Sequence, residues 1–234
     1  MRSTTPLLPA IAGPPPPEAA AVFAEPGALD RAVGYAELLA TEGVLRGLIG
    51  PREVPRLWDR HLLNCAAIAD LVPARSRVVD VGSGAGLPGI ALALARSDLH
   101  VVLLEPLARR VAFLEECRDR LGLDPVDVVR GRAEDPEVVD RLGGADVVTA
   151  RAVARLDRLA TWCLPLLRPG GLLVAIKGET AAEELAAAGP ILRRAGGAEA
   201  KVVEIGSSVV SATAVVVVAG RGTVPAKVRG GRGR

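Results

Sequence analysis

The amino-acid sequence predicts an α/β fold: a seven-stranded, mostly parallel sheet with an antiparallel terminal hairpin and a small N-terminal helical cap. Three observations predict it. From residue 76 onward, short apolar runs rich in Val and Leu alternate with helical segments, which is typical of a parallel sheet with right-handed crossovers. A cluster of glycines follows the first of these runs, and the last two runs lie too close together for a helix between them.

Length and composition bound the organisation of the chain. Half of its 234 residues are hydrophobic, which suffices for one packed domain with a small addition. Residues 1–27 are rich in Pro and Ala and are expected to be a disordered tail, followed by a helical cap over 28–75 and a cofactor-binding domain over 76–220. The last stretch, 221–234, carries five cations and no acid, and is expected to be a disordered basic tail.

The composition excludes several classes of protein. The formal net charge is only +2, so attraction to a polyanion has to come from local patches and the basic tail. Cys65, Cys117 and Cys163 fit neither a zinc spacing nor a disulfide framework, and with two histidines no metal site is expected. Neither a signal peptide nor an apolar run of membrane-spanning length occurs, so we expect a cytoplasmic protein without a membrane partner.

Two helices are expected in the cap. Between residues 29 and 48 apolar residues recur at steps of three and four, and Pro51 and Pro55 end this period. A second helix is predicted over residues 57–72, with Leu and Ala along its apolar side.

In the domain that follows, each element is predicted from an apolar run or a helical period. Strands at 77–81, 100–105, 126–130, 145–150 and 172–177 alternate with helices that begin near Pro88 and span 108–121, 135–142, 155–167 and 181–195. The runs 201–205 and 214–219 are expected to form a hairpin, so the sheet ends with an antiparallel strand. A sheet that binds a dinucleotide through two equal halves does not normally end that way.

The segment after the first strand carries the strongest functional signal. The strand brings Asp80 to its carboxyl end, and Gly82, Gly84 and Gly86 make a tight turn. Glycines let a backbone approach a ligand closely, and the N-terminus of the next helix offers unpaired N–H groups to an anion. We therefore expect a cofactor at this turn.

Two cofactors compete for the turn. Gly84, Gly86 and Gly89 match the G-x-G-x-x-G pattern of NAD-binding proteins. Asp80 favours S-adenosylmethionine instead, because an acid would repel a pyrophosphate but can hold the ammonium of a methionine moiety, directly or through water. Glu105, at the end of the second strand, is then placed to accept bonds from both ribose hydroxyls. With the terminal hairpin added, S-adenosylmethionine is the preferred cofactor.

The segment Arg132-Ala-Glu-Asp135 follows the third strand. Its backbone is placed to meet the adenine edge, with Ala133 leaving space, and an ordinary helix cap explains the same spacing equally well.

Several segments carry a family resemblance. Val79–Gly89 contains Asp-Val-Gly-Ser-Gly-Ala-Gly-Leu-Pro-Gly, whose Leu-Pro-Gly extension is more specific than the glycines alone. Further matching segments stand in the same order: Arg60-His61, Arg109–Leu114, Ala150–Leu156 and Ile176–Glu179. Together they resemble the bacterial RsmG (GidB) family, whose members methylate N7 of a guanine in small-subunit (16S) ribosomal RNA. The resemblance covers roughly residues 30–220 and leaves both tails outside.

This resemblance implies a Rossmann-like class I methyltransferase fold with S-adenosylmethionine as the cofactor. It implies that Gly82, Leu87, the Ala133–Glu134 pair and Arg151 contact the cofactor or line its pocket. The implied partner is small-subunit ribosomal RNA, as free RNA, a 30S subunit or an assembly intermediate, and we expect a monomer.

The chemistry needs few catalytic groups. N7 of guanine has a free lone pair and no proton to remove, so transfer needs in-line placement and no general base. Enzymes that methylate exocyclic amines commonly carry an Asn/Asp-Pro-Pro-aromatic turn after the fourth strand, where Thr149–Ala152 stands here. No catalytic residue is assigned beyond Arg151, which is a candidate for positioning the substrate through guanine O6 or a phosphate. An ion pair with Asp80 or Glu134 is an equal alternative for that arginine.

Contacts with RNA are less well marked. Arg60, His61 and Lys177 form a candidate basic rim. Flipped bases usually stack on aromatic or arginine faces, and only Trp58 and Trp162 are large enough, the latter among residues typical of a core. Three other functions stay open from the sequence: a methyltransferase for a small metabolite, an NAD-dependent oxidoreductase and a noncatalytic RNA-binding module.

Overall fold

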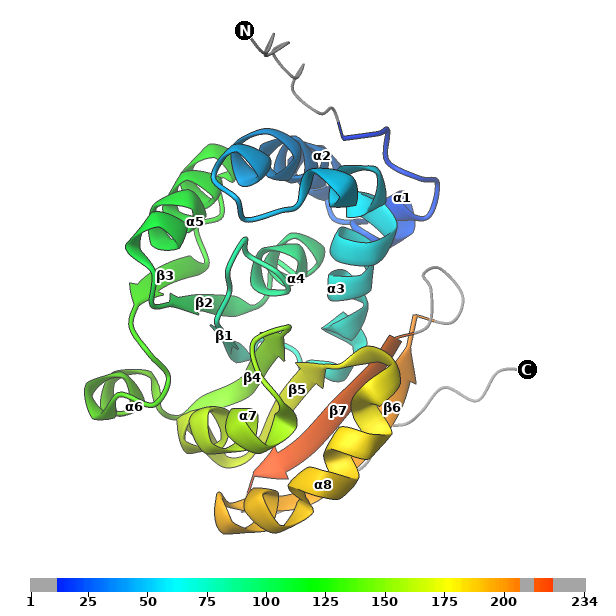
Figure 1. Ribbon diagram of the computed structural model, residues 1–234. Helices are drawn as coiled ribbons and strands as arrows, with labels where there is room; N and C mark the ends of the chain where they lie inside the picture. The colour runs from blue at the N-terminus through cyan, green and yellow to red at the C-terminus, as the bar shows by residue number, and fades with distance from the viewer. Residues whose placement is uncertain (1–11, 207–212, 221–234) are drawn as a thin grey trace, which may run out of the picture.

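The computed structural model describes residues 12–206 and 213–220, and a seven-stranded sheet runs through its middle (Figure 1). The strand order is β3-β2-β1-β4-β5-β7-β6. β1 to β5 are parallel, whereas β7 is antiparallel to both β5 and β6. The predicted sheet and its terminal hairpin are thus confirmed. The strands are β1 (Arg77–Val81), β2 (His100–Glu105), β3 (Val126–Arg130), β4 (Ala145–Arg151), β5 (Leu167–Ile176), β6 (Gly197–Ile205) and β7 (Thr213–Gly220).

Successive residues of the central strands pack alternately into two separate apolar cores. Val78 and Val101 belong to one apolar cluster, and their neighbours Val79 and Val102 belong to the other. Side chains of a strand point alternately to opposite faces, so runs that are apolar at every position bury both faces. This is why the runs of Val and Leu in the sequence become the inner strands of a covered sheet.

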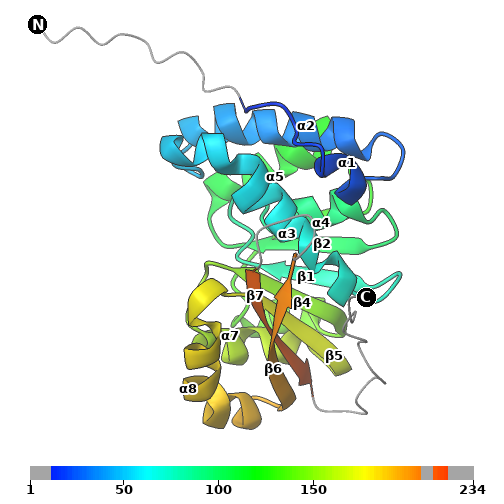
Figure 2. The ribbon, with the colours of Figure 1, turned by 90° about the vertical axis from the view of Figure 1, so that its right-hand side faces the viewer.

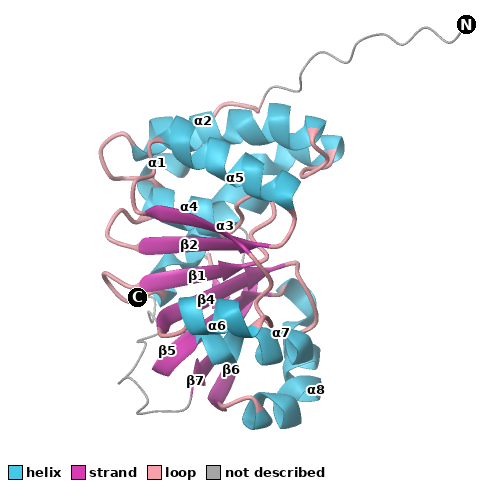
Figure 3. Ribbon diagram, turned by 90° about the vertical axis from the view of Figure 1, so that its left-hand side faces the viewer, coloured by secondary structure: helices cyan, strands magenta, loops and turns pink. Residues whose placement is uncertain are grey.

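Helices cover both faces (Figures 2 and 3). The first cluster is completed by the N-terminal half of the chain and the second by the helices that follow β3. On the first face lie α1 (Ala19–Val22), α2 (Ala28–Leu38), α3 (Asn64–Ala66), α4 (Gly89–Ala95) and α5 (Ala108–Leu121). On the second lie α6 (Pro136–Leu142), α7 (Leu156–Cys163), the short turns η5 (Leu164–Leu166) and η6 (Gly178–Thr180), and α8 (Ala181–Arg194).

The cap has the predicted position but a less regular build. Its first helix runs through α2 into the π-helical turn η1 (Leu39–Gly43). Its second helix is a run of four pieces: η2 (Pro51–Arg56), η3 (Leu57–Leu63), α3 and η4 (Ala67–Leu71). Pro55 lacks an N–H group, so the run begins as a 3-10 turn and not as an α-helix. π-helical turns such as η3 are frequent at functional sites.

The N-terminal segment differs from its prediction. The sequence predicts a disordered tail over 1–27, but residues 12–27 are described and pack against the cap. Phe23 is 2% exposed, Ala19 is fully buried, and Trp58 Nε1 donates a hydrogen bond to the carbonyl of Gly13 at 2.8 Å. The run of prolines indicated disorder, whereas Ala19 and Phe23 join the apolar cluster of the cap. The tails predicted over 1–11 and 221–234 lie outside the described residues.

The parallel strands place their carboxyl ends along one edge of the sheet. That edge collects the glycine turn after β1, Glu105 at the end of β2, the segment after β3 and Arg151 at the end of β4. The chain order reverses between β1 and β4, and ligands bind open α/β sheets outside such a switch point. Throughout the described residues, every helix is too short or too polar to cross a lipid bilayer.

Candidate functional site

Three adjoining cavities open at the carboxyl edge of the sheet. The largest, of about 860 Å³, lies over β1, β2 and the segment after β3. A smaller one of about 250 Å³ lies between the glycine turn and the cap. A third of about 760 Å³ lies between the cap, the loop after β4 and the end of β5. Ala152 lines all three, so the cavities adjoin one another in one hollow around the end of β4.

The structure brings most of the predicted site residues to this hollow. Gly82, Glu105, Ala133 and Glu134 line the largest cavity. The smaller cavity is lined by Gly82, Gly84, Leu87, His61 and Arg151. Arg60, Lys177 and again Arg151 line the third. Two predicted residues line none of the three cavities: Asp80 lies beneath the turn, and Gly86, within the turn, packs against Ile90 and Tyr35.

The glycine turn requires glycine for different reasons at different positions. Gly86 has a φ of +97°, and a Cβ atom there would lie 2.4 Å from Ile90 Cδ1 and 2.8 Å from Tyr35 Oη. Gly84 has a φ of +59°, but a Cβ there would meet only the carbonyl oxygen of Gly82, at 3.7 Å. Gly86 is therefore needed for packing, whereas the open side of Gly84 faces the smaller cavity.

Asp80 fastens the turn from below. Its side chain is 0% exposed: Oδ2 accepts the N–H of Gly89 at 3.0 Å and Oδ1 accepts the hydroxyl of Thr149 at 2.9 Å. Burial raises the pKa of this carboxyl from its ordinary value of 3.8 to about 6, against the lowering effect of these hydrogen bonds. The predicted contact with a cofactor ammonium stays a prediction, and it would add to these two bonds.

Glu105 ties the end of β2 to the same turn. Its Oε2 accepts the N–H of Gly84 at 3.0 Å and its Oε1 accepts the N–H of Leu107 at 3.1 Å. Arg110 Nη1 lies 3.7 Å from Oε2. Each carboxylate oxygen keeps a further lone pair, so the two bonds orient the group without using up its capacity. The acid at the rim of the largest cavity is thus held in place for hydroxyl groups of a ligand.

The walls of the largest cavity combine apolar and charged side chains. Ala133 is buried and leaves space beside the exposed Glu134. Trp162 is half-buried and lines the opposite wall, with the Arg158 guanidinium 5.9 Å from its ring centre. Trp162 lies among core residues, as predicted, because it packs against the second apolar cluster, and its remaining surface lines this cavity. Trp58 is buried in the cap instead, which removes it as a stacking platform.

Arg151 spans the gap between the sheet and the cap. Nη2 donates to the carbonyl of Arg60 at 2.9 Å and lies 3.1 Å from His61 Nδ1, and Nη1 lies 2.9 Å from the sulfur of Cys65. The ion pair with Asp80 or Glu134 that the sequence left open is not formed; among the described residues, no carboxylate lies within ion-pair distance of this guanidinium. Its charge therefore remains available at the junction of the smaller and third cavities.

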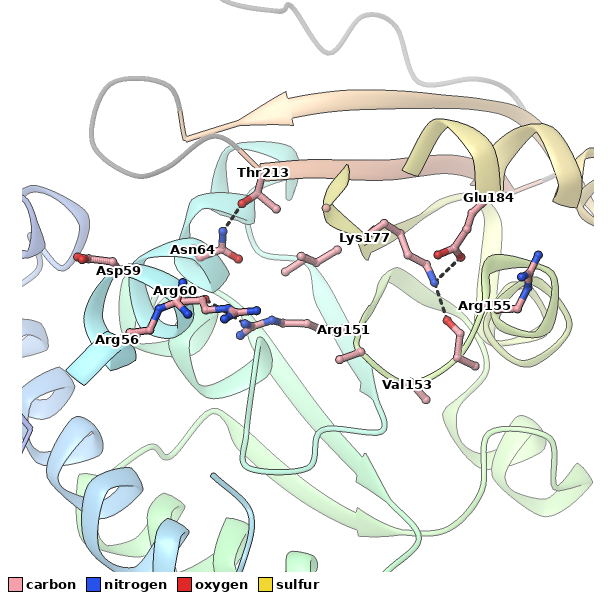
Figure 4. Close-up of a pocket in the computed structure, with 14 residues that line it drawn as sticks. Arg56, Asp59, Arg60, Asn64, Arg151, Val153, Arg155, Lys177, Glu184 and Thr213 are labelled. Carbon is pink, nitrogen blue, oxygen red and sulfur yellow. Dashed lines mark hydrogen bonds and ion pairs between the residues drawn. The ribbon is translucent and has the colours of Figure 1, made fainter. Parts of the chain in front are cut away.

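The third cavity has an excess of positive charge, as Figure 4 shows. Arg56, Arg60 and Arg155 are exposed at its rim, and Arg151 lies at its inner wall. Asn64 of the cap donates a hydrogen bond to the hydroxyl of Thr213 on β7, which joins the cap to the terminal hairpin.

The predicted basic rim is only partly present. Lys177 is 8% exposed, and its Nζ lies 2.8 Å from Glu184 Oε2 and donates to the carbonyl of Ala154 at 2.5 Å. His61 is bonded to Glu53 and Arg151. Only Arg60 is an exposed cation, and Arg56 and Arg155 take the places of the other two. Glu184, one helical turn into α8, pairs with the charge of Lys177, and a contact of Lys177 with RNA stays a prediction.

Two supporting residues were not foreseen. Tyr35, the only tyrosine of the chain, donates its hydroxyl from α2 to the carbonyl of Ala85 at 2.8 Å, and burial raises its pKa well above 10.0. Thr149 is a polar residue in the apolar run of β4, directly opposite Asp80 in the register. A lone polar residue inside an apolar run is a signal that could have identified Thr149.

The residues fit S-adenosylmethionine. The largest cavity is of the size that holds small-molecule cofactors, and it combines a fixed acid with apolar side chains of β1 and β2 and a small residue where a flat ring needs space. The adjoining smaller cavity adds the open side of the glycine turn and an unpaired guanidinium, which suit the amino-acid end of such a ligand.

Comparison with known proteins gives one consistent family. The family model described as rRNA small subunit methyltransferase G (GidB) matches residues 28–208. The ribosomal RNA small subunit methyltransferase G of Mycolicibacterium gilvum is 58% identical over 214 residues, which cover 92% of this chain and 93% of the relative. The protein of the same name from Streptomyces coelicolor is 58% identical over 217 residues, covering 92% of this chain and 89% of its own.

Solved structures share the fold. A SAM-dependent methyltransferase from Aquifex aeolicus gives a TM-score of 0.54 at 19% identity, covering 74% of this chain and 97% of its own. TYW2 from M. jannaschii, solved in complex with AdoMet, gives 0.52 at 20% identity, covering 70% and 76%.

Proposed function

This chain belongs to the GidB family of small-subunit ribosomal RNA methyltransferases, and we propose that it transfers a methyl group from S-adenosylmethionine to N7 of a guanine in 16S ribosomal RNA. One observation carries the proposal beyond the family. The cavity beside the glycine turn, which fits the donor, adjoins at Ala152 and Val153 a second cavity rimmed by arginines, which fits a nucleotide of RNA.

The donor lies in the two cavities beside the glycine turn. When bound, S-adenosylmethionine supplies a methyl group activated by a sulfonium. Glu105 holds the ribose hydroxyls, the backbone around Ala133 meets the adenine, and the turn at 82–84 accommodates the amino-acid end. Because Glu105 and Asp80 are both bonded to this turn, its conformation is fixed before the donor arrives.

The acceptor nucleotide enters the third cavity. Arg56, Arg60 and Arg155 lie at the rim, where guanidinium groups can hold phosphates, and Arg151 lies where the cavity meets the glycine turn. The loop Ala152–Val153 separates the acceptor from the donor. Ala152 adopts a φ of 54°, a left-handed conformation that bends this loop over Gly82.

N7 fits this site better than an exocyclic amine does. The ring nitrogen carries an in-plane lone pair and no proton, so the protein has to align the acceptor and no base has to remove a proton. The Thr149–Ala152 segment lacks the turn typical of amine methylation, and its Thr149 hydroxyl is engaged by Asp80. Placement of the base by the surrounding arginines therefore accounts for the reaction.

The third cavity argues against a small metabolite as the acceptor. Such an enzyme is expected to close an apolar pocket over its substrate, whereas three exposed arginines at a rim suit a polyanion. The proposed substrate is a 30S subunit or an assembly intermediate, because a folded RNA would hold the acceptor nucleotide within reach of the cavity. The proposal includes a monomeric enzyme that acts in the cytoplasm.

Methyl transfer in vitro tests the proposal. Purified protein is incubated with isotope-labelled S-adenosylmethionine and 30S subunits that lack the modification, and the RNA is cleaved chemically at N7-methylguanine. We expect one labelled guanine in 16S RNA and no label in 23S RNA. Label on an exocyclic amine, or label on small metabolites in the absence of RNA, would refute it.

A further inference from the structure

A chain of three polar side chains runs from the cap to the end of β4. Glu53 lies on η2, His61 on η3 and Arg151 on β4. Glu53 Oε2 lies 2.9 Å from His61 Nε2, and His61 Nδ1 lies 3.1 Å from Arg151 Nη2. Both ring nitrogens of the histidine are therefore engaged, one with an acid and one with a cation.

These contacts define the protonation of His61. A guanidinium can only donate hydrogen bonds, so Nδ1 has to offer a lone pair to Arg151. The proton of the neutral ring then lies on Nε2 and is donated to the Glu53 carboxylate. The histidine is neutral in this arrangement, and its side chain is 12% exposed, so water has little access to either bond.

Every contact of Arg151 with the cap is made to a neutral acceptor. Besides His61 these are the carbonyl of Arg60 and the sulfur of Cys65. The arginine is thus oriented without being neutralised. Of the five N–H donors of a guanidinium, these three contacts leave two for a ligand at the junction of the smaller and third cavities.

We propose that Glu53 and His61 are positioning residues that hold Arg151 at the junction of the donor and acceptor cavities, and that protonation of His61 releases it. The proposal rests on the proposed function, since it gives Arg151 the task of aligning donor and acceptor. Protonated His61 would present an N–H group and a positive charge to the guanidinium, so the bond between them would be lost.

The charged groups around His61 give the direction of the effect. Burial and the charge of Arg151 lower the pKa of His61 below its ordinary value of 6.5; Glu53 raises it and Arg60 lowers it further. The contacts that run from Glu53 through His61 to Arg151, here called the relay, are therefore intact at neutral and alkaline pH. Methyl transfer falls as the pH drops through the pKa of His61. Asp80, with its pKa of about 6, adds a titration of its own that is independent of Glu53.

Substitutions separate the relay from a merely structural role. His61→Asn keeps an acceptor near the position of Nδ1 and cannot titrate, so we expect its pH profile of kcat/KM to lack the acid loss due to His61, and its kcat/KM at pH 8 to exceed that of His61→Leu. His61→Leu removes the acceptor, and we expect kcat/KM at pH 8 to fall by about tenfold to a hundredfold, as for a lost hydrogen bond to a charged group. Glu53→Gln keeps an acceptor for Nε2 but removes the charge, so the acid limb should move to lower pH.

The other histidine supplies the matched control. His100 Nε2 lies 3.0 Å from Asp127 Oδ2 at the amino end of β2, on the opposite edge of the sheet. Asp127→Asn makes the same change of charge beside a histidine and should leave the pH profile of kcat/KM unchanged. An acid limb that is the same in the wild type and Glu53→Gln, or wild-type kcat/KM in His61→Leu, would overturn the relay.

NMR tests the relay without any reliance on activity. The chain has two histidines, so a ¹⁵N-histidine spectrum resolves both rings. We expect the Nε2–H form of His61 at pH 7.5, a lowered His61 pKa in Glu53→Gln and a raised one in Arg151→Met. An Nδ1–H form of His61, or a His61 pKa that is unchanged in both variants, would overturn the relay. If the NMR results hold but the wild type transfers no methyl group to 30S subunits, the proposed function fails and the relay stands.

Discussion

At the scale of single residues, Asp80 shows how a buried acid serves the turn above it. Its two oxygens hold Gly89 and Thr149, which fixes where β1 ends and where α4 begins. An isosteric amide could keep both bonds, accepting from Gly89 and donating to the Thr149 hydroxyl. The negative charge is thus not needed for the fold, and burial makes it costly.

Asp80→Asn should change the pH dependence of stability. The folded state binds a proton at Asp80 up to about pH 6, whereas the unfolded chain releases it near 3.8. Stability from this group is therefore fully present below about pH 4 and is lost as the pH rises through 6. As the pH rises from 4 to 7, the free energy of unfolding of the variant, measured in urea, should increase relative to that of the wild type by on the order of 3 kcal/mol.

The same variant tests the predicted ammonium contact. If Asp80 holds the amino group of the donor, Asp80→Asn weakens S-adenosylmethionine binding in calorimetric titrations at pH 7 while the fold persists. An identical pH dependence of stability in both proteins would contradict the raised pKa. Unchanged donor affinity would remove Asp80 from the binding residues.

At the scale of elements, two glycines of the same turn have different roles: Gly84 leaves space for a ligand, and Gly86 is needed for packing. Gly84 and Gly86 both have left-handed backbones, but only at Gly86 does a Cβ collide with neighbouring side chains. Gly84→Ala should cost about 1–2 kcal/mol of backbone strain and fold normally. Its methyl group would enter the smaller cavity, so we expect at least about a tenfold loss of donor affinity, equal to about 1.4 kcal/mol.

Gly86→Ala is the matched comparison. The added methyl group collides with Ile90 and Tyr35, so about 1–3 kcal/mol of overpacking adds to the strain, and the larger loss should be in stability. Urea unfolding and calorimetric titration of both variants check the two effects. Equal destabilisation by the two substitutions, or full donor affinity in Gly84→Ala, would contradict this division.

The N-terminal segment is a second element whose packing can be measured. Phe23→Ala removes a buried aromatic ring from the cap, and we expect the free energy of unfolding to fall by about 3–5 kcal/mol. Ala20 is exposed on α1, so Ala20→Ser should change it by less than about 0.5 kcal/mol. A loss below about 1 kcal/mol for Phe23→Ala would show that the segment does not contribute to the core.

At the scale of the whole molecule, the cap and the sheet together create a basic rim that neither has alone. Arg56 and Arg60 come from the cap, and Arg155 comes from the loop after β4. With a net charge of only +2, the protein has to attract RNA through such a local patch.

The salt dependence of RNA binding tests this rim. Arg56→Ala and Arg155→Ala should each weaken binding and reduce the slope of log K against log salt by about 1. Arg194 is exposed at the far end of α8, at the opposite edge of the sheet, so Arg194→Ala should leave the slope unchanged. A uniform effect of all three substitutions would contradict a localised rim.

Local patterns predicted the fold and the position of the glycine turn. The alternation of apolar runs and helices gave the strand positions, and glycines next to Asp80 marked the turn. The acceptor half depends on contacts between distant parts of the chain. Arg151 meets Cys65 and His61 across 86 and 90 residues, and no pattern in the sequence reports such a distance in space. Nor did any pattern decide between substrate contact and an ion pair for Arg151, or show that Lys177 pairs with Glu184.

Analysis of 16S RNA from cells that lack this gene tests the central claim most directly. The claim predicts that one N7-methylguanine disappears, that the wild-type gene restores it and that a Gly84→Asp variant, whose carboxylate occupies the open side of the turn, does not. An unchanged modification pattern in the deletion strain, or full restoration by Gly84→Asp, would contradict it.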